Sequence, residues 1–282
     1  MRFLCLLTLC IGVTLGAPIP GFPIGRCVKV LGVTAPEDAT KVGFEYVELA
    51  LQDTLALDEV EFAKLVARIR GLGIPALSGY GFLPADMKIV GPDVNTAELD
   101  RMLTHSMARA VRLGLKMVVY GNLNGAARHA PEGYAHDLAM KQVVDFGQRA
   151  AKEAGKQGIV ILFEPMPARS TNTVNTVAEG IDLVRKVHHP NFGLLVDFSY
   201  MTQGKEDMAI LKTAAKYIRQ VEISNPNGRV YPKLATEADY AGFFRILKQG
   251  GYKGGFSIHG APTDFFVDAP RAIGMLQGLL RE

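Results

Sequence analysis

The sequence contains only three cysteines, and two of them lie close to its N-terminus. Cys5 and Cys10 would be lost with an N-terminal export signal, which would leave Cys27 alone and exclude an internal disulfide. We therefore expect the fold to depend on its own apolar core. Cys27 is expected to be a buried, inert thiol rather than a nucleophile.

The sequence also lacks a clear excess of charge of either sign. It has 31 Lys and Arg residues against 28 Asp and Glu residues, a formal net charge of +3 that falls to +2 without Arg2. Such a balance provides neither the basic surface that nucleic acid requires nor a polybasic patch for membranes. We expect neither partner for the mature protein.

The N-terminal apolar run is too short to span a membrane comfortably. Arg2 precedes an apolar stretch over residues 3–15, and the small residue Gly16 stands where a signal would be cut. We predict a cleaved export signal at residues 1–16, a linker at 17–26 and a periplasmic or extracellular location. A buried N-terminal helix is the weaker interpretation, because the Pro- and Gly-rich PIPGFPIG follows at once.

Short apolar runs alternate with amphipathic segments through the rest of the sequence. Between the runs, apolar residues recur three and four positions apart, as in helices. Eight such alternations predict an α/β fold, a closed (β/α)₈ TIM barrel, and roughly 265 mature residues are close to the usual size of one such domain. The predicted strands are 27–33, 44–51, 74–80, 116–122, 159–165, 192–198, 218–224 and 254–260.

Local signals support the predicted element boundaries. Thr176 and Glu179 form a capping-box pattern at the start of a helix, and Gly114, Gly155 and Gly251 stand where helices should end. The longest connections, residues 81–95 and 122–134, follow the third and fourth strands. Long loops at the C-terminal face of a TIM barrel commonly form the substrate site.

Each of the last four predicted strands ends in a side chain that binds metals. Glu164, Asp197, Glu222 and His259 each follow an apolar run and precede loop-forming residues. Because parallel strands of a barrel end at the same mouth, these side chains are expected to converge there. Three carboxylates and one imidazole would bind one divalent cation, with Mn²⁺ favoured and Mg²⁺, Co²⁺ or Zn²⁺ as alternatives.

The centre of the sequence carries a series of short motifs: EPMP at 164–167, the pair NT at 175–176, and HPNFGLLVD at 189–197. The series resembles the sugar phosphate isomerase/epimerase family, the xylose isomerase-like TIM barrels that include ketose 3-epimerases. The resemblance implies a metal-dependent enzyme acting on a small sugar, with barrels that often pair through their loops. It is specific at the centre of the chain and weaker towards both ends.

The resemblance also assigns the ligands by position. Glu164 and Asp197 match the first two ligands of the family, whereas the third is usually a histidine and the fourth a glutamate. In this chain Glu222 and His259 have exchanged these two places. An exchange that keeps three carboxylates and one imidazole is what retained metal binding would produce.

Other departures concern the reaction. The family's epimerases use two glutamate ligands as acid/base groups, and only Glu164 keeps this role by resemblance. A further family glutamate is replaced by Ser170, and a family histidine by Tyr200. These departures argue against simple two-base epimerisation at C3. One carboxylate is enough for isomerisation, and also for elimination or hydration next to a keto group.

Several other residues are candidates for the sugar site. Arg229 matches a family arginine near the substrate and is predicted, with Glu164, to be catalytic. Glu48 ends the second predicted strand and points either to the mouth or into a polar core below it; the mouth is favoured. Lys88 and His129, in the two long loops, and Tyr200 are further candidates for substrate binding, although loop Lys and His are often simply solvated.

We therefore predict an exported metal-dependent isomerase or epimerase that acts on a keto sugar through a metal-stabilised enediolate. The alternatives are a lyase or hydratase acting on 3-keto sugars or glycosides, and a sugar-binding barrel without catalysis. An endonuclease IV-type function is disfavoured, because such enzymes need a histidine-rich cluster and the six histidines here are scattered.

The signal prediction can be tested on exported protein. We expect residues 1 to about 16 to be missing, because the pattern of Arg2 and apolar residues ends in small residues before a Pro-rich segment. N-terminal sequencing of the exported protein is the measurement. An intact Met1 on that material would contradict the prediction.

Overall fold

Eight short strands form a closed parallel barrel in the computed structural model, which describes residues 17–30, 36–84, 86–121 and 126–282. Each strand pairs with its neighbours in sequence, and β1 pairs with β8 to close the barrel. The predicted single-domain TIM barrel is confirmed. The strands are β1 (Ile24–Val28), β2 (Tyr46–Ala50), β3 (Ala76–Tyr80), β4 (Met117–Tyr120), β5 (Val160–Phe163), β6 (Phe192–Asp197), β7 (Ile218–Ile223) and β8 (Gly255–Ile258).

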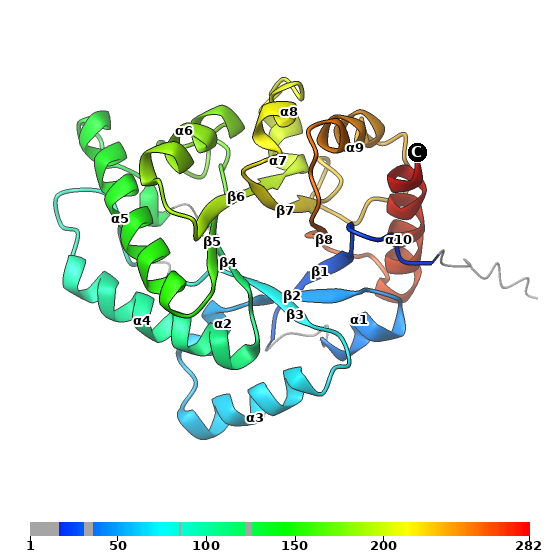
Figure 1. Ribbon diagram of the computed structural model, residues 1–282, viewed down its shortest axis with the longest axis horizontal. Helices are drawn as coiled ribbons and strands as arrows, with labels where there is room; N and C mark the ends of the chain where they lie inside the picture. Colours follow the sequence, from blue (N-terminus) through cyan, green and yellow to red (C-terminus); the bar gives the residue numbers. More distant parts are fainter. Residues whose placement is uncertain (1–16, 31–35, 85, 122–125) are drawn as a thin grey trace, which may run out of the picture.

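Helices form an outer layer around the barrel (Figure 1). Their apolar faces pack on the outside of the strands and bury the main core, whose members include Phe62, Leu103, Phe146 and Phe243. The helices are α1 (Glu37–Lys41), α2 (Gln52–Leu55), α3 (Glu59–Arg70), α4 (Thr96–Leu113), α5 (His136–Lys156), α6 (Val177–Val187), α7 (Phe198–Gln203), α8 (Ile210–Ala214), α9 (Tyr240–Gln249) and α10 (Phe265–Arg281), with a short 3₁₀ helix η1 (Ala126–Arg128).

The first strand begins earlier than predicted. We expected a linker up to residue 26 and a strand over 27–33, but β1 spans Ile24–Val28. Gly25 pairs with β2, and Ile24 and Gly25 pair with β8. We assigned both residues to the linker because Pro and Gly residues surround them. The predicted signal at 1–16 lies outside the described residues, so its cleavage stays a prediction.

The predicted helix signals fall at or near real helix ends. The Thr176 hydroxyl accepts a hydrogen bond from the backbone N–H of Glu179, whose carboxylate accepts one in return, so the capping box is confirmed. Gly114 ends α4 with a φ of 88°, which favours glycine. Gly155 lies inside α5, which ends at Lys156, and Gly251 directly follows the cap of α9.

A tyrosine closes the N-terminal end of the barrel interior. Tyr46 is buried, and its hydroxyl lies 2.8 Å from the Ser257 hydroxyl on β8, two strands away. A side chain at Gly25 would overlap the Tyr46 ring, and a Cβ at Gly255 would lie 2.7 Å from its hydroxyl oxygen. Glycine on β1 and β8 therefore provides the space in which Tyr46 fills the bottom of the barrel.

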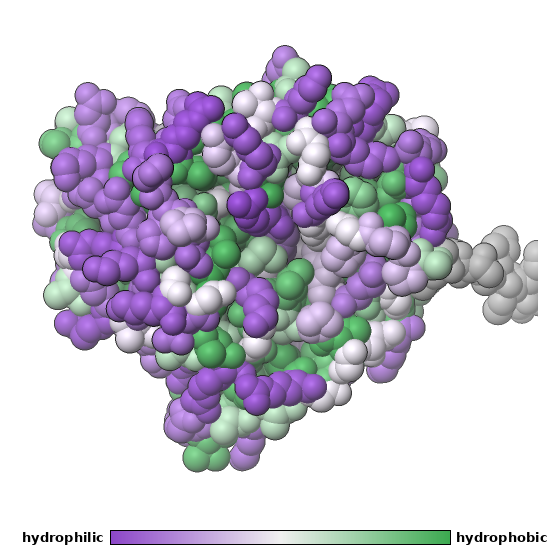
Figure 2. Space-filling model, viewed as in Figure 1, coloured by the Kyte–Doolittle hydropathy of each residue, from purple (hydrophilic) through white to green (hydrophobic). Residues whose placement is uncertain are grey.

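Hydrophilic residues cover most of the face shown in Figure 2, and apolar residues appear between them as separate patches. None of the described helices combines the length and apolar composition that a membrane span requires.

The packing around Tyr46 generates a prediction. We expect Gly25→Ala to lower the free energy of unfolding by about 1–3 kcal/mol, because the added methyl group overfills the barrel bottom. Gly278→Ala is the matched control, since a Cβ at this position of α10 meets open space. Denaturant unfolding measures both variants. If Gly25→Ala were as stable as the wild type, Tyr46 would be able to move aside without cost.

Candidate active site

The four predicted metal ligands lie at the C-terminal end of the barrel. Glu164 directly follows β5, Asp197 is the last residue of β6, Glu222 lies near the end of β7, and His259 directly follows β8. The three carboxylates are buried and the imidazole is half-buried. Asp197 and Glu222 are register partners on neighbouring strands, which brings their side chains together.

A cavity of about 210 Å³ opens above these residues. Gly121, just after β4, has no side chain at a point where a Cβ would overlap the Glu164 carboxylate. The missing side chain therefore lets Glu164 reach the cavity. The lining residues are Tyr80, Gly121, Glu164, Met166, Tyr200, Glu222, Arg229 and His259.

The predicted ligands form two overlapping groups rather than one. Donor atoms of Glu164, Asp197 and Glu222 all lie within 4.8 Å of one another. His259 instead joins Glu222 and Cys27 in a second group with the same mutual limit. Glu222 belongs to both groups, and its Oε2 is hydrogen-bonded to Nδ1 of His259.

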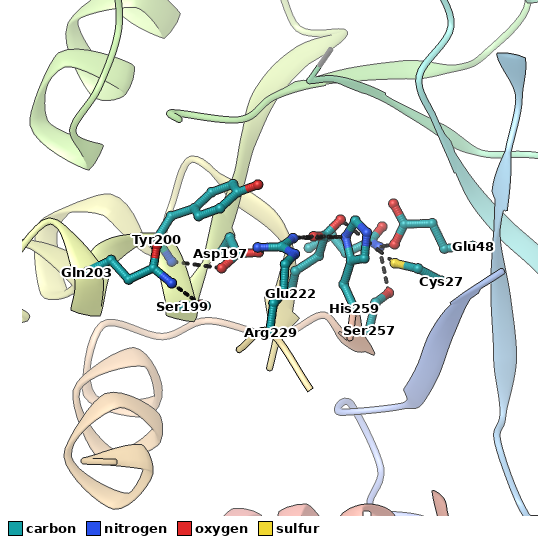
Figure 3. A network of polar contacts seen from close by, with 11 residues as sticks. Cys27, Glu48, Asp197, Ser199, Tyr200, Gln203, Glu222, Arg229, Ser257 and His259 are labelled. Atoms are coloured by element: carbon teal, nitrogen blue, oxygen red, sulfur yellow. Dashed lines mark hydrogen bonds and ion pairs between the residues drawn. The ribbon is translucent and has the colours of Figure 1, made fainter. Parts of the chain in front are cut away.

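Arg229 places a positive charge among these groups (Figure 3). Its Nη2 lies 2.8 Å from Asp197 Oδ2, 3.4 Å from Glu222 Oε2 and 3.2 Å from His259 Nδ1. The guanidinium also stacks 4.4 Å from the centre of the Tyr200 ring. Its backbone φ of 51° is unusual for a residue with a side chain, so the loop holds Arg229 in a strained conformation to deliver this charge.

Asp197 has a structural role as well. Its Oδ1 accepts a hydrogen bond of 2.9 Å from the backbone N–H of Tyr200 and caps α7. This cap fixes the carboxylate and places the Tyr200 ring beside the cavity. Oδ2 of Asp197 forms the ion pair of 2.8 Å with Arg229 Nη2.

Burial raises the pKa of two carboxyl groups of the site, Glu164 and Glu222. Desolvation, followed by the charges of Glu222 and Asp197, raises the pKa of Glu164 from 4.5 to about 8. Desolvation and the Asp197 charge raise the pKa of Glu222 to about 8 as well. Burial and Arg229 lower the pKa of His259, which favours its neutral form. Burial acts against the Arg229 charge, but Asp197 and Glu222 outweigh it and raise its pKa.

Glu48 lies below the cavity rather than at the mouth that we favoured. It is fully buried and accepts a hydrogen bond from Nε2 of Gln220, which also donates to the Ser257 hydroxyl at 2.8 Å. Burial and the Glu222 charge raise its pKa to about 8. Glu48 therefore belongs to the buried polar core that was the alternative interpretation.

Sequence reasoning did not identify Gln220 and Ser257 as members of this polar core, although a signal for them was present. Side chains two positions apart on a strand share a face. Gln220 precedes Glu222 by two positions and Ser257 precedes His259 by two, so both face the interior one layer below. Tyr80, Gly121 and Met166 in the cavity carry no comparable signal in the sequence.

The two loop candidates lie away from the cavity. Lys88 is exposed and lines a separate surface hollow with Asp86, Asp93 and Glu98. His129 is exposed after η1 and is not among the described residues that line the cavity. The loop lengths placed them near the barrel mouth, but their side chains face solvent.

The donor set fits a divalent cation. Three buried carboxyl groups have donor atoms within 4.8 Å of one another, and Arg229, whose Nη2 lies 2.8 Å from Asp197 Oδ2, is the guanidinium that faces them. Carboxylate oxygens that converge in this way are the ligands that hard divalent cations prefer. Arg229 already shows that a positive charge is favoured at this point.

A closed parallel barrel with buried carboxylates around a cavity at its C-terminal strand ends is the arrangement of a TIM-barrel enzyme. The family described as xylose isomerase-like TIM barrel matches residues 36–273. The chain belongs to this family, and the resemblance noted in the sequence is confirmed.

Similar proteins include several sugar epimerases. An L-ribulose 3-epimerase from Methylomonas sp. (strain DH-1) is 30% identical over 224 residues, which cover 77% of this chain and 73% of that protein. The structure of a D-allulose 3-epimerase from Methylomonas sp. has a TM-score of 0.77 at 24% identity, with 92% and 98% of the chains covered. That of a 3-keto-D-glucoside 4-epimerase from E. coli has a TM-score of 0.73 at 18% identity, with 93% and 100% covered. These two structures bear on the fold alone.

The raised carboxyl pKa values predict how stability depends on pH. Between pH 4.5 and about 8 the folded protein holds a proton on Glu164 that the unfolded chain has released. Rising pH therefore favours unfolding in this window. We expect the free energy of unfolding to fall from pH 4.5 to 8 when a chelator keeps the protein metal-free.

Denaturant unfolding at a series of pH values is the measurement. Glu164→Gln should make the fall shallower, because the amide does not titrate. Stability that rises across this window in the metal-free protein would contradict the assignment.

Proposed function

We propose that this protein is an exported, metal-dependent enzyme that isomerises or epimerises a keto sugar. The observation that carries the proposal is the position of Glu164, a buried carboxyl group with a pKa of about 8 that faces a small cavity beside two further carboxylates. A group with a pKa near neutral pH can both accept and return a proton.

The relatives support the class of reaction. They include an L-ribulose 3-epimerase and a D-psicose 3-epimerase, and the chain is an enzyme of the sugar isomerase and epimerase kind. The cavity of about 210 Å³ is smaller than the roughly 300–1,000 Å³ of pockets for drug-sized ligands. Its size suits a single small sugar better than an oligosaccharide.

Glu164, Asp197 and Glu222 would hold the cation, with His259 orienting Glu222 through its hydrogen bond. A bound divalent cation would polarise a sugar carbonyl and stabilise the negative charge that develops on loss of a neighbouring proton. Glu164 removes this proton and returns it to the adjacent carbon. Arg229 and the Tyr200 hydroxyl, which both line the cavity, position the sugar oxygens.

The protein groups favour a mechanism with one acid/base residue. His259 replaces the family's second glutamate and is hydrogen-bonded to Glu222. Ser170, at the position of a further family glutamate, is not among the described residues that line the cavity. One carboxyl group supports isomerisation, and it also supports elimination or hydration next to a keto group, which are the alternative reactions. Mn²⁺ remains the cation that the three carboxylates of Glu164, Asp197 and Glu222 favour.

The function is tested with D-psicose, L-ribulose and a 3-keto-glucoside as substrates in D₂O. We expect deuterium to enter the product, because a proton removed by Glu164 exchanges with solvent. Glu164→Gln should lower turnover by about a hundred- to ten-thousand-fold, the usual contribution of a positioned acid/base group. Nuclear magnetic resonance of the products distinguishes epimers, isomers and dehydrated sugars.

Glu206→Gln is the matched control. Glu206 is a partly buried carboxyl group with a raised pKa, and it accepts a hydrogen bond from the backbone N–H of Val177, away from the cavity. Its turnover should stay near that of the wild type. Wild-type turnover by a metal-loaded Glu164→Gln variant would refute the role of Glu164, and sugar binding without turnover would indicate a non-catalytic barrel.

A further inference from the structure

Cys27 faces the inside of the barrel. It lies on β1 and packs against an inner apolar cluster of Ala50, Tyr80, Val119, Leu162 and Leu195. Like His259, it is only half-buried, whereas Glu48 and Glu222 are fully buried. Figure 3 shows Cys27 beside Glu48 and His259, on the far side of Glu222 from Asp197.

The donor atoms around Cys27 have the spacing of a metal site. Those of Cys27, Glu222 and His259 lie within 4.8 Å of one another, and the Cys27 Sγ is 3.9 Å from Glu222 Oε1. Sulfur and oxygen ligands of one tetrahedral Zn²⁺ lie about 3.6 Å apart, given bond lengths of about 2.3 and 2.1 Å. Side-chain adjustments of a few tenths of an ångström would therefore bring both atoms onto one cation.

A fourth donor lies next to this group. Glu48 is the register partner of Cys27 on β2 and is fully buried. Gln220 donates to its Oε2, but its Oε1 has no hydrogen-bond partner among the described residues. A buried oxygen left in this state is costly unless a proton or a cation compensates it.

We propose that Cys27, Glu222 and His259 bind a thiophilic divalent cation, Zn²⁺ or Co²⁺, with Glu48 as the fourth donor. On binding, the thiol releases its proton to solvent and the sulfur takes the cation in its place. Thiolate and imidazole ligands select Zn²⁺ and Co²⁺ over Mn²⁺ and Mg²⁺, which prefer oxygen. This site differs from the cluster of Glu164, Asp197 and Glu222, because it contains neither Glu164 nor Asp197. Of the four ligands predicted from the sequence, it includes only Glu222 and His259.

Cobalt provides a direct test that does not depend on turnover. The full chain, reduced and freed of metal, is titrated with Co²⁺ without oxygen, and its absorption is recorded. We expect a near-ultraviolet thiolate-to-cobalt charge-transfer band in the wild type. Cys27→Ser should abolish the band, and because this variant keeps Cys5 and Cys10, it also controls for them.

Asp197→Asn is the matched control for the neighbouring carboxylate group. It should keep the band, because Asp197 is not a donor of the proposed site, whereas Glu222→Gln should weaken it. A wild-type protein that binds Co²⁺ without the band would overturn the proposal. So would a band of equal strength in wild type and Cys27→Ser.

Selectivity supplies a second measurement. The protein is incubated with Zn²⁺ and Mn²⁺ together, and elemental analysis gives the ratio of the two bound metals. Cys27→Ser should lower the preference for Zn²⁺ over Mn²⁺ by at least about 10- to 100-fold. Loss of a residue that only hydrogen-bonds to a metal ligand commonly has an effect of this size on metal affinity. If the variant does not fold, alkylation of the wild type decides: Zn²⁺ should protect Cys27 from iodoacetamide and Mg²⁺ should not. Equal alkylation with both ions, or unchanged selectivity, would overturn the proposal.

Discussion

The interior of the barrel must accommodate four carboxyl groups that are almost completely removed from water. Glu48, Glu164, Asp197 and Glu222 lie on four different strands or strand ends, and each would lose its hydration on folding. Such groups stay neutral or require a positive partner. Arg229 supplies a positive charge beside Asp197 and Glu222, and raised pKa values keep protons on the others. The chemistry of the site follows from this imbalance, because a surplus of buried oxygen donors favours the entry of a cation.

The barrel divides these carboxyl groups into two levels. Glycines on β1 and β8 admit the Tyr46 ring at the bottom, and Ser257, Gln220 and Glu48 form a hydrogen-bonded layer above it. Glu164, Asp197 and Glu222 lie at the strand ends beyond that layer, where the cavity opens. Because successive inward positions on a strand are two residues apart, the lower layer supports the upper one directly. Changes to the polar core are therefore expected to affect the orientation of the carboxyl groups at the cavity.

Glu222 and His259 link the polar groups of the site to one another. On β7 the carboxylate of Glu222 lies between two clusters, with Oε2 facing Arg229 and His259 and Oε1 facing Cys27. Directly after β8, the imidazole of His259 is hydrogen-bonded to Glu222 and lines the cavity together with Glu164. This arrangement brings the Cys27 thiol within reach of the carboxyl groups at the cavity. The chain thus combines the family fold with a centre in which a thiol, an imidazole and carboxyl groups lie close together.

Strand spacing, helix caps and polar strand ends could be predicted from the sequence, because each depends on neighbouring residues. The eight strands, the Thr176 capping box and the four polar residues at the mouth are all of this kind. Tertiary structure decided which distant residues meet. Register placed Asp197 opposite Glu222 and Cys27 opposite Glu48. The barrel also put Glu48 below the cavity and brought His259 close to Cys27 and Glu222. The conformations of the long loops turned Lys88 and His129 toward solvent. A sequence sets the face on which a side chain lies through local periodicity, whereas contacts between strands depend on the stagger and closure of the whole barrel.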